Sequence, residues 1–203
     1  MCGRYGGTKH LGGYSDVLKM PFPKAMTVAA EINPMQMAPV IARGRDGTNT
    51  VVEARWSLIP SSFTGHVADW RASTTHARLE EIGEKPAFAR AWQKRRRVIV
   101  PAACYWEWSD RLGRARTERR KWRIASADDE PLAIAGLWDH ALTQEGPILS
   151  FTMLTRAPGV RMGRLHDREP VVLHAHEMKS WLDGENLDLT APWEDDAFRL
   201  EAA

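Results

Sequence analysis

The sequence lacks the features that mark a secreted or membrane protein. It has two cysteines in 203 residues, Cys2 and Cys104, and two cysteines do not make the disulfide framework of a small secreted domain. No apolar run approaches the ~18 residues of a membrane-spanning helix. The opening segment MCGRYGGTKH has no apolar stretch typical of a secretory signal. We therefore expect a cytoplasmic protein that does not enter a membrane.

The sequence also lacks the common cofactor motifs. It has no Walker loop, no dinucleotide-binding glycine fingerprint and no G-x-S-x-G nucleophile turn. The cysteines form no C-x-x-C pair, and His174 and His176 are far from either cysteine, so the ligand spacing of a zinc site is absent. We expect neither a metal ion nor an organic cofactor.

What the chain does contain is the composition of a globular protein, with 43% hydrophobic and 27% charged residues. A chain of this length buries roughly 70% of its unfolded surface, so it needs neither a disulfide nor a metal to fold. We expect a monomer with one domain over residues 1–203, in which the acidic segment from about residue 177 to residue 203 is peripheral.

The net charge of +2 hides an uneven distribution. Residues 90–123 contain twelve Lys and Arg against three Asp and Glu, and four of the nine tryptophans lie in the same stretch. Phosphates attract cations and exposed bases stack on flat rings, so this mixture suits single-stranded nucleic acid. A charge run is equally typical of a solvated surface, and most tryptophans are core residues, so the composition alone leaves both interpretations open.

The hydrophobic pattern predicts more strands than helices. Segments rich in Val, Ile, Trp or alternating apolar residues, each ended by Gly, Pro or charged residues, predict strands. Shorter segments with helical spacing predict helices, one of them with a proline at its start. Successive strands with helices between groups indicate an α+β fold, with a mainly antiparallel, curved or barrel-like sheet and flanking helices. The predicted strands are Thr50–Leu58, Arg97–Trp108, Lys121–Ala125, Leu132–Trp138 and Ile148–Thr155, with a hairpin tip at Arg111–Gly113, and the predicted helices are Thr75–Ile82, Pro86–Lys94 and Ala175–Leu182.

Cys2 is the first candidate for covalent chemistry. Removal of Met1 would leave an α-amine with a reference pKa of about 8 beside a thiol with a reference pKa of about 8.5. Such a 1,2-aminothiol condenses with an aldehyde to an imine, and the thiol then closes a five-membered thiazolidine ring. Gly3 would let the backbone enter a narrow site, and Arg4 could hold a phosphate. The alternative interpretation is that Cys2 is an ordinary residue of a mobile terminus.

Glu107 and His166 are the candidates for proton transfer. Glu107 lies between two tryptophans at the end of an apolar strand, where we expect its carboxylate to be at least half buried and its pKa to be raised. A surface glutamate opposite an arginine is the alternative. His166 is followed by Asp167, which could orient the imidazole or simply remain solvated.

These residues together resemble the SOS-response-associated peptidase (SRAP) family of abasic-site-crosslinking proteins. The resemblance covers most of the chain, and its motifs occur in the order typical of the family. The similar residues and segments are Met1–Tyr5, Pro34, Gln36, Pro39-Val40, Arg55–Pro60, Pro86–Phe88, Arg95–Arg97, Pro101-Ala102, Tyr105–Trp108, Ala135–Trp138, Phe151–Thr155 and His166–Pro170.

The sequence departs from the family pattern at several positions. Asp69 stands where the family has asparagine, Ser73 where it has glutamate, and Glu31 where it has another polar residue. Ser57 replaces a glycine and Glu169 replaces a methionine. These changes affect the segments that would surround the site, so they bear directly on efficiency and substrate range.

The resemblance implies an enzyme of the DNA damage and SOS response that binds single-stranded DNA and forms a covalent protein–DNA linkage at abasic sites. It implies catalytic roles for Cys2, Glu107, His166 and Asp69. It implies DNA contacts by Arg4, Trp56, Arg71, Thr155 and Arg168, with Trp56 stacking on a base or wedging beside it. The family name also implies hydrolase activity, as a protease that removes its own Met1.

Two other functions fit the same residues. One is a cysteine peptidase or amidohydrolase without a DNA substrate. The other is a non-catalytic module that binds single-stranded DNA, in which the substitutions at Glu31 and Asp69 have removed the chemistry.

Overall fold

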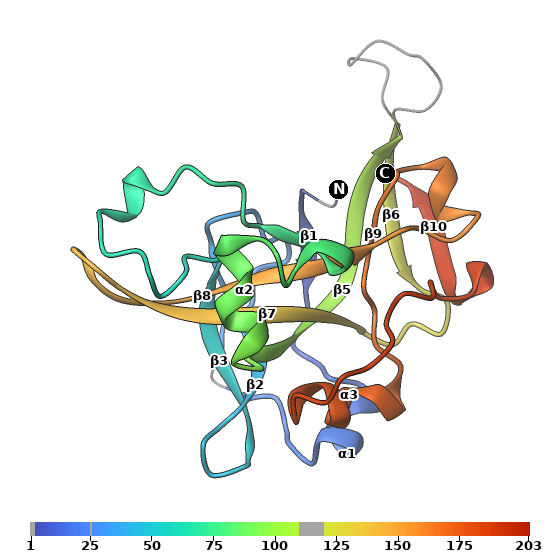
Figure 1. The fold of residues 1–203 in the computed structure, drawn as a ribbon. Coiled ribbons are helices and arrows are strands. Elements are labelled where there is room, and N and C mark those ends of the chain that lie inside the picture. The colour runs from blue at the N-terminus through green and yellow to red at the C-terminus, as the bar shows by residue number, and fades with distance from the viewer. Residues whose placement is uncertain (1–2, 25, 110–119) are drawn as a thin grey trace.

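Five strands close into a barrel in the computed structural model, which describes residues 3–24, 26–109 and 120–203 (Figure 1). Each strand of the ring pairs with two others, in the order β5-β2-β3-β8-β7 and back to β5. All of these pairs are antiparallel except β3 with β8. This confirms the predicted α+β fold with a mainly antiparallel, barrel-like sheet. The barrel strands are β2 (Met37–Arg43), β3 (Asn49–Trp56), β5 (Arg97–Ser109), β7 (Leu132–Thr143) and β8 (Gly146–Arg156).

Five further strands extend the barrel at its edges. Strands β6 (Arg120–Ser126) and β10 (Phe198–Ala202) continue the sheet beyond β5, so the acidic C-terminal segment ends on its outer edge. Strand β1 (Tyr5–Gly7) also pairs with β5. Strands β4 (His76–Arg78) and β9 (Glu169–Pro170) pair with β8.

The barrel interior is filled by alternate residues of its strands, as a pleated sheet requires. Val40 and Val100 point into it beside the aromatic rings of Trp56 and Phe151, and all four are fully buried. Gly136 on β7 permits the close approach of β8, because a Cβ at this position would lie 2.6 Å from the carbonyl oxygen of Thr152.

Among the described residues, three α-helices cover the outside of the barrel. Helix α2 (Pro86–Gln93) begins at the predicted proline, and α3 (Ala175–Leu182) ends two residues before Gly184, which has a left-handed φ of +77°. The short helix α1 (Tyr14–Leu18) packs beside α3. Their apolar faces and the outward-facing strand residues form a second core. No helix in the described part of the chain is long and apolar enough to cross a membrane.

The predicted helix Thr75–Ile82 is wrong. His76–Arg78 instead forms β4, parallel to Met153–Thr155 of β8, and a 3-10 turn at Leu79–Glu81 follows it. Within β4 only Ala77 is buried, and its neighbours are more exposed, which is the alternation of an edge strand. Pairing with β8 therefore outweighs the weak helical spacing of this segment. The predicted hairpin tip Arg111–Gly113 lies outside the described residues.

Candidate active site

The candidate active site lies where β1 meets the second half of β5. Tyr5 is opposite Tyr105 in the antiparallel register, and the backbone N–H of Trp106 donates to the carbonyl of Arg4 at 3.1 Å. The segment just before β1 is therefore adjacent to the part of β5 that bears Glu107. Residues Met1 and Cys2 lie outside the described residues.

Glu107 is 2% exposed, so the expected burial of this carboxylate is confirmed. Burial raises its pKa from 4.5 to about 7, and the nearby carboxylate of Asp167 adds to the increase. The backbone N–H of Trp108 acts in the opposite direction by stabilising the charged form. A carboxyl group with this pKa exists in both protonation states at neutral pH, as a general acid and base requires.

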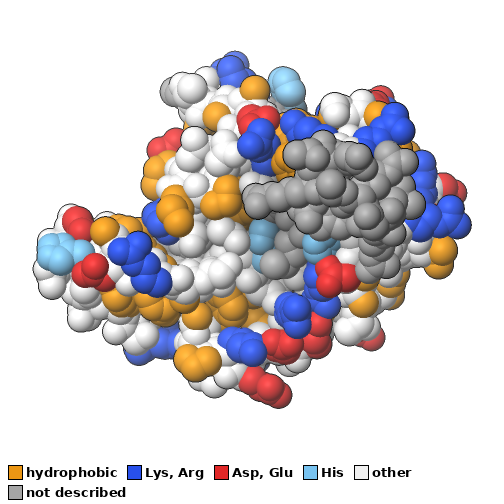
Figure 2. Space-filling view, turned by 90° about the horizontal axis from the view of Figure 1, so that it is seen from above, with side chains coloured by type: hydrophobic (Ala, Val, Ile, Leu, Met, Phe, Trp, Pro, Cys, Tyr) orange, Lys and Arg blue, Asp and Glu red, His pale blue; other side chains and the backbone are white. Residues whose placement is uncertain are grey.

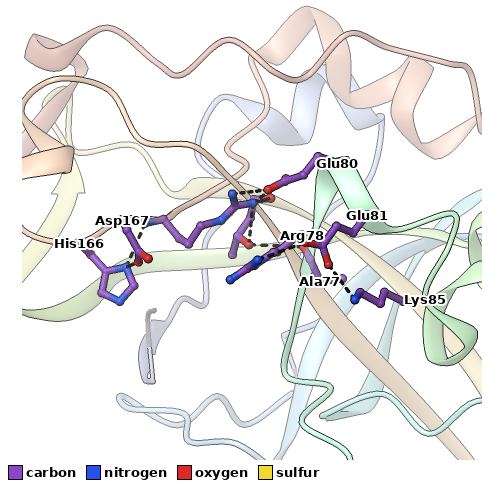
Figure 3. Close-up of polar contacts among 9 residues, drawn as sticks. Ala77, Arg78, Glu80, Glu81, Lys85, His166 and Asp167 are labelled. Carbon is purple, nitrogen blue, oxygen red and sulfur yellow. Dashed lines mark hydrogen bonds and ion pairs between the residues drawn. The ribbon is translucent and has the colours of Figure 1, made fainter.

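The segment His166–Arg168 lies within electrostatic reach of Glu107, because Asp167 contributes to the pKa of that residue. The Nδ1 atom of His166 accepts a hydrogen bond from the backbone N–H of Arg168 at 3.0 Å and lies 2.8 Å from Oδ1 of Asp167 (Figure 3). In the neutral ring the first contact leaves the proton on Nε2. Protonation of Nδ1 would favour the contact with Asp167 instead.

Arg168 is held on two sides. Its Nη1 and Nη2 atoms lie 2.5 and 2.8 Å from the two carboxylate oxygens of Glu80, and Nη2 also donates to the carbonyl of Thr155 at 2.7 Å. Figure 3 shows Glu80 on one side of this cluster and the His166–Asp167 pair on the other. Thr155 itself is 1% exposed. The structure shows Thr155 holding Arg168 through its carbonyl, and a direct contact of Thr155 with DNA stays a prediction.

Arg4 forms an ion pair with Glu31, one of the positions at which the sequence departs from the family pattern. Its Nη1 atom lies 2.6 Å from Oε1 of Glu31, and its guanidinium lies over the ring of Trp108 at 5.8 Å. Two backbone hydrogen bonds, of 3.1 and 2.8 Å, join the neighbouring residues Tyr5 and Ile32. They bring the two segments together and so place the side chains of Arg4 and Glu31 within reach of each other.

Asp69 and Arg71 lie on the loop between β3 and β4, which projects from the barrel in Figure 1. Both side chains are exposed, and neither forms an ion pair with any residue that the structure describes. The base of the loop is fixed by a 3.0 Å hydrogen bond between the hydroxyls of Ser57 and Thr74. Asp69 does not contact Glu107 or His166, so the structure does not bring this predicted catalytic residue together with the other two.

Trp56 is fully buried. Its ring packs edge-on against Tyr5 and His76, with centroids 5.1 and 5.6 Å away, and its Nε1–H donates to the carbonyl of Thr75 at 2.9 Å. The structure thus places Trp56 in the interior, and the expectation that it stacks on or wedges beside a base stays a prediction. Trp56 supports Tyr5 and β4 from inside the barrel.

The surface around the site carries charges of both signs. Figure 2 shows Lys and Arg side chains on both sides of the residues that are not described, with carboxylates among them. Lys121 lies 4.9 Å from the ring centroid of Trp106, and Arg120 lies at the same distance from that of Trp122. No group of three or more His, Cys, Asp or Glu in the described part of the chain could hold a metal ion.

Comparison with known proteins identifies the family. The sequence matches the SOS response associated peptidase (SRAP) family over residues 1–201. The chain belongs to the SRAP family. A relative from Bacillus subtilis, named abasic site processing protein YoaM, is 34% identical over 72% of this chain, and the match spans 63% of the relative's length. The Xenopus tropicalis abasic site processing protein HMCES is 26% identical over 74% of this chain and 52% of its own length.

A crystal structure from Bordetella bronchiseptica has the same SRAP fold. It superimposes with a TM-score of 0.86 at 26% identity and covers 100% of this chain and 99% of its own. A crystal structure from Bacteroides thetaiotaomicron, at 20% identity, gives a TM-score of 0.79 over 99% of this chain and 91% of its own. The latter likeness establishes the fold alone.

One departure from the SRAP pattern is compensated within the fold. Glu169, which stands where the resemblance leads us to expect methionine, is buried and lies 3.0 Å from Nε of Arg156. Its second oxygen accepts the backbone N–H of Gly159 at 3.1 Å. The buried carboxylate is thus paired with a cation and hydrogen-bonded, as burial of a charge requires.

Proposed function

We propose that this SRAP protein binds single-stranded DNA and covalently traps abasic sites through Cys2 after removal of Met1. The observation that carries the proposal is the buried carboxyl group of Glu107, with a pKa raised to about 7, on the strand that pairs with the N-terminal segment. The relatives named as abasic site processing proteins support the choice of substrate.

The reaction needs two bond-forming steps at one carbon atom. The open-chain abasic sugar presents an aldehyde, and the α-amine of Cys2 adds to its carbon to give a carbinolamine, which loses water to form an imine. The thiol of Cys2 then adds to the same carbon, and its proton ends on the ring nitrogen. The product is a thiazolidine, formed from the aldehyde and the aminothiol with release of one water molecule.

Glu107 would move the protons in these steps. Its carboxyl group can protonate the departing hydroxyl of the carbinolamine, and its carboxylate can accept the thiol proton during ring closure. His166 would protonate the sugar oxygen when the ring opens and assist reversal of the adduct. Arg4, Arg71 and Arg168 would bind the flanking phosphates. Shielding the lesion in this way would protect a damaged single strand.

The family name further suggests that the protein removes its own Met1 as a protease. A protein that ends in a stable adduct with its own nucleophile consumes that nucleophile, so each chain would act once unless the adduct reverses.

The test is incubation with single-stranded DNA that contains one abasic site, followed by a denaturing gel. A slowly migrating band supports the proposal. Hydrolysis of peptides or amides without such a band would favour the peptidase or amidohydrolase. Salt-dependent DNA binding without a band would favour the non-catalytic binding module. Mass spectrometry of the purified N-terminus is the control, because a retained Met1 prevents formation of the thiazolidine.

A further inference from the structure

Carboxylates hold two of the arginines that the proposed function assigns to DNA phosphates. Arg4 forms a 2.6 Å ion pair with Glu31. Arg168 forms two parallel contacts of 2.5 and 2.8 Å with the two oxygens of Glu80. This bidentate geometry is also the one in which a guanidinium binds a phosphate group. A carboxylate therefore occupies the position that a phosphate would take.

Both carboxylates remain accessible to solvent, and Glu80 is far more exposed than the arginine that it holds. The side chains of Glu31 and Glu80 are 36% and 51% exposed, whereas that of Arg168 is 10% exposed. Arg168 also donates to the Thr155 carbonyl, so its position does not depend on Glu80 alone. A phosphate group, which a guanidinium binds in the same bidentate geometry, can approach from the open side and replace such a carboxylate.

We propose that Glu31 and Glu80 compete with the phosphate backbone for Arg4 and Arg168, and that a bound strand displaces them. This inference rests on the function proposed above. A carboxylate beside an arginine cancels its charge, so the pair contributes little to the neutralisation of DNA and to the release of counterions. An intact strand then binds weakly, whereas a strand with an aldehyde gains a covalent bond that the carboxylates do not oppose.

The experiment measures binding of an intact, fluorescein-labelled oligothymidylate by anisotropy over a series of salt concentrations. Glu31→Gln and Glu80→Gln should each tighten binding by about 3- to 5-fold at low salt, the range of one exposed ion pair. Each should also steepen the dependence of log affinity on log salt by up to ~0.7, the value for one added phosphate contact on a single strand.

Glu84→Gln is the matched control. Glu84 lies four residues from Glu80, is exposed, and forms no ion pair with the described residues, so the change removes the same charge without releasing an arginine. We expect little gain from it. A second control places Glu80→Gln in an Arg168→Ala background, where competition for the arginine no longer exists and the gain should disappear.

Four results would overturn the inference. An equal gain from Glu84→Gln, or a gain that persists without Arg168, would show a general effect of charge. A lower melting temperature with weaker binding in both glutamine variants would show that the pairs only stabilise the fold. Adduct formation by the wild type is scored separately on an abasic strand. If the wild type forms the adduct but the glutamine variants do not bind DNA more tightly, this inference alone is wrong. If the variants bind more tightly but no adduct forms, the proposed covalent function is wrong and the competition for the arginines still holds.

Discussion

At the scale of single residues, the environment of each carboxylate decides what it can do. Glu107 is excluded from solvent, so its pKa rises to about 7 and it can exchange protons at neutral pH. Glu80 accepts hydrogen bonds from Arg168, which lower the pKa of its carboxyl group, so it remains a charged partner. Asp69 is exposed on a projecting loop. The same functional group is thus a buried carboxyl with a raised pKa at Glu107, an ion-pair partner at Glu80 and a surface charge at Asp69.

The first prediction concerns the aminothiol. Cys2→Ala should abolish the heat-stable adduct, because ring closure needs the thiol. Cys2→Ser should leave at most an imine that borohydride can reduce. Insertion of alanine between Met1 and Cys2 keeps the thiol but separates it from the α-amine, and it should also abolish the adduct. Denaturing gels with and without borohydride measure all three, and an undiminished adduct from Cys2→Ala would refute the mechanism.

The second prediction uses the raised pKa of Glu107. Its carboxyl group ionises near pH 4.5 in the unfolded chain but near pH 7 in the folded protein. Below pH 4.5 the group is neutral in both states and does not affect the free energy of unfolding. As the pH rises from 4.5 to about 7, the unfolded chain ionises more readily than the folded protein, so the free energy of unfolding falls by about 3 kcal/mol in total. Glu107→Gln cannot ionise and should avoid this loss.

Thermal melts at pH 5 and pH 8 test this expectation. The melting temperature of Glu107→Gln relative to the wild type should rise between the two values, while adduct formation by the variant becomes slower. Other titrating groups are common to both proteins and cancel in the comparison. A difference in melting temperature that does not change with pH would contradict the assigned pKa.

The burial of Glu107 could be predicted from the sequence, but the burial of Trp56 could not. The tryptophans on either side of Glu107 and the apolar strand before it are local features that indicate an interior position. The alternation of β3 does not show whether the Trp56 side chain points into the barrel or out of it. Its burial follows from tertiary packing, in which the rings of Tyr5 and His76 lie against it. The partners Glu31 and Glu80 were missed because they lie 27 and 88 positions from their arginines.

At the scale of elements, long strands were predictable and short ones were not. Strand β5 has 13 residues, and its continuous apolar pattern fixes it without tertiary information. Strand β4 has three residues and exists because β8 offers it an edge. Strand β2 has seven residues around Pro39 and lacks the long apolar pattern that makes the 13-residue β5 recognisable despite Pro101. Strand β4 therefore takes its structure from a partner that is distant in sequence, whereas β2 pairs along its whole length with β3, the next strand in the chain.

The third prediction concerns the ion pair that connects β8 and β9. The side chains of Arg156 and Glu169 are 4% and 0% exposed, and Arg156 also donates to the carbonyl of Leu189 at 3.1 Å. Glu169→Met should lower the free energy of unfolding by about 3–5 kcal/mol, because it leaves a buried guanidinium without a counter-charge. Urea unfolding measures the loss.

The double variant Arg156→Met with Glu169→Met is the control for this pair. It removes both charges and keeps the volume apolar, so it should recover at least half of the loss. Equal instability of the single and double variants would show that the hydrogen bonds to Gly159 and Leu189, rather than the uncompensated charge, dominate at this position.

At the scale of the whole molecule, the number of basic residues overstates the positive charge available to DNA. Arg97, within the basic stretch, is buried between the rings of Trp92 and Trp181, 3.6 and 4.5 Å from their centroids, and burial lowers its pKa to about 10. Other arginines are paired with carboxylates on neighbouring strands, as Arg123 is with Glu201. At least Arg97 and Arg123 of this stretch therefore do not present a free positive charge to a strand.

The fourth prediction concerns the charge of Asp69. Asp69 is exposed and has no ion-pair partner among the described residues, so its charge acts on an approaching strand without local compensation. Arg71 on the same loop is also unpaired within the described ranges. Asp69→Asn removes the repulsion and leaves the arginine unchanged. It should tighten binding of an intact single strand by about 2- to 5-fold at low salt, the range of one exposed charge contact.

The gain from Asp69→Asn should shrink as salt rises, because the screening length falls from roughly 30 Å at 0.01 M to roughly 8 Å at 0.15 M.

Asp16→Asn is the control, since it removes an equal charge from exposed α1, which Figure 1 places at the other end of the barrel. Anisotropy titrations at low and moderate salt compare the two variants. Equal gains would assign the effect to total charge, and weaker binding by Asp69→Asn at both salt concentrations would mean that Asp69 supports the loop or contacts the strand favourably. A gain confined to low salt and to Asp69 would place the DNA path along the loop between β3 and β4.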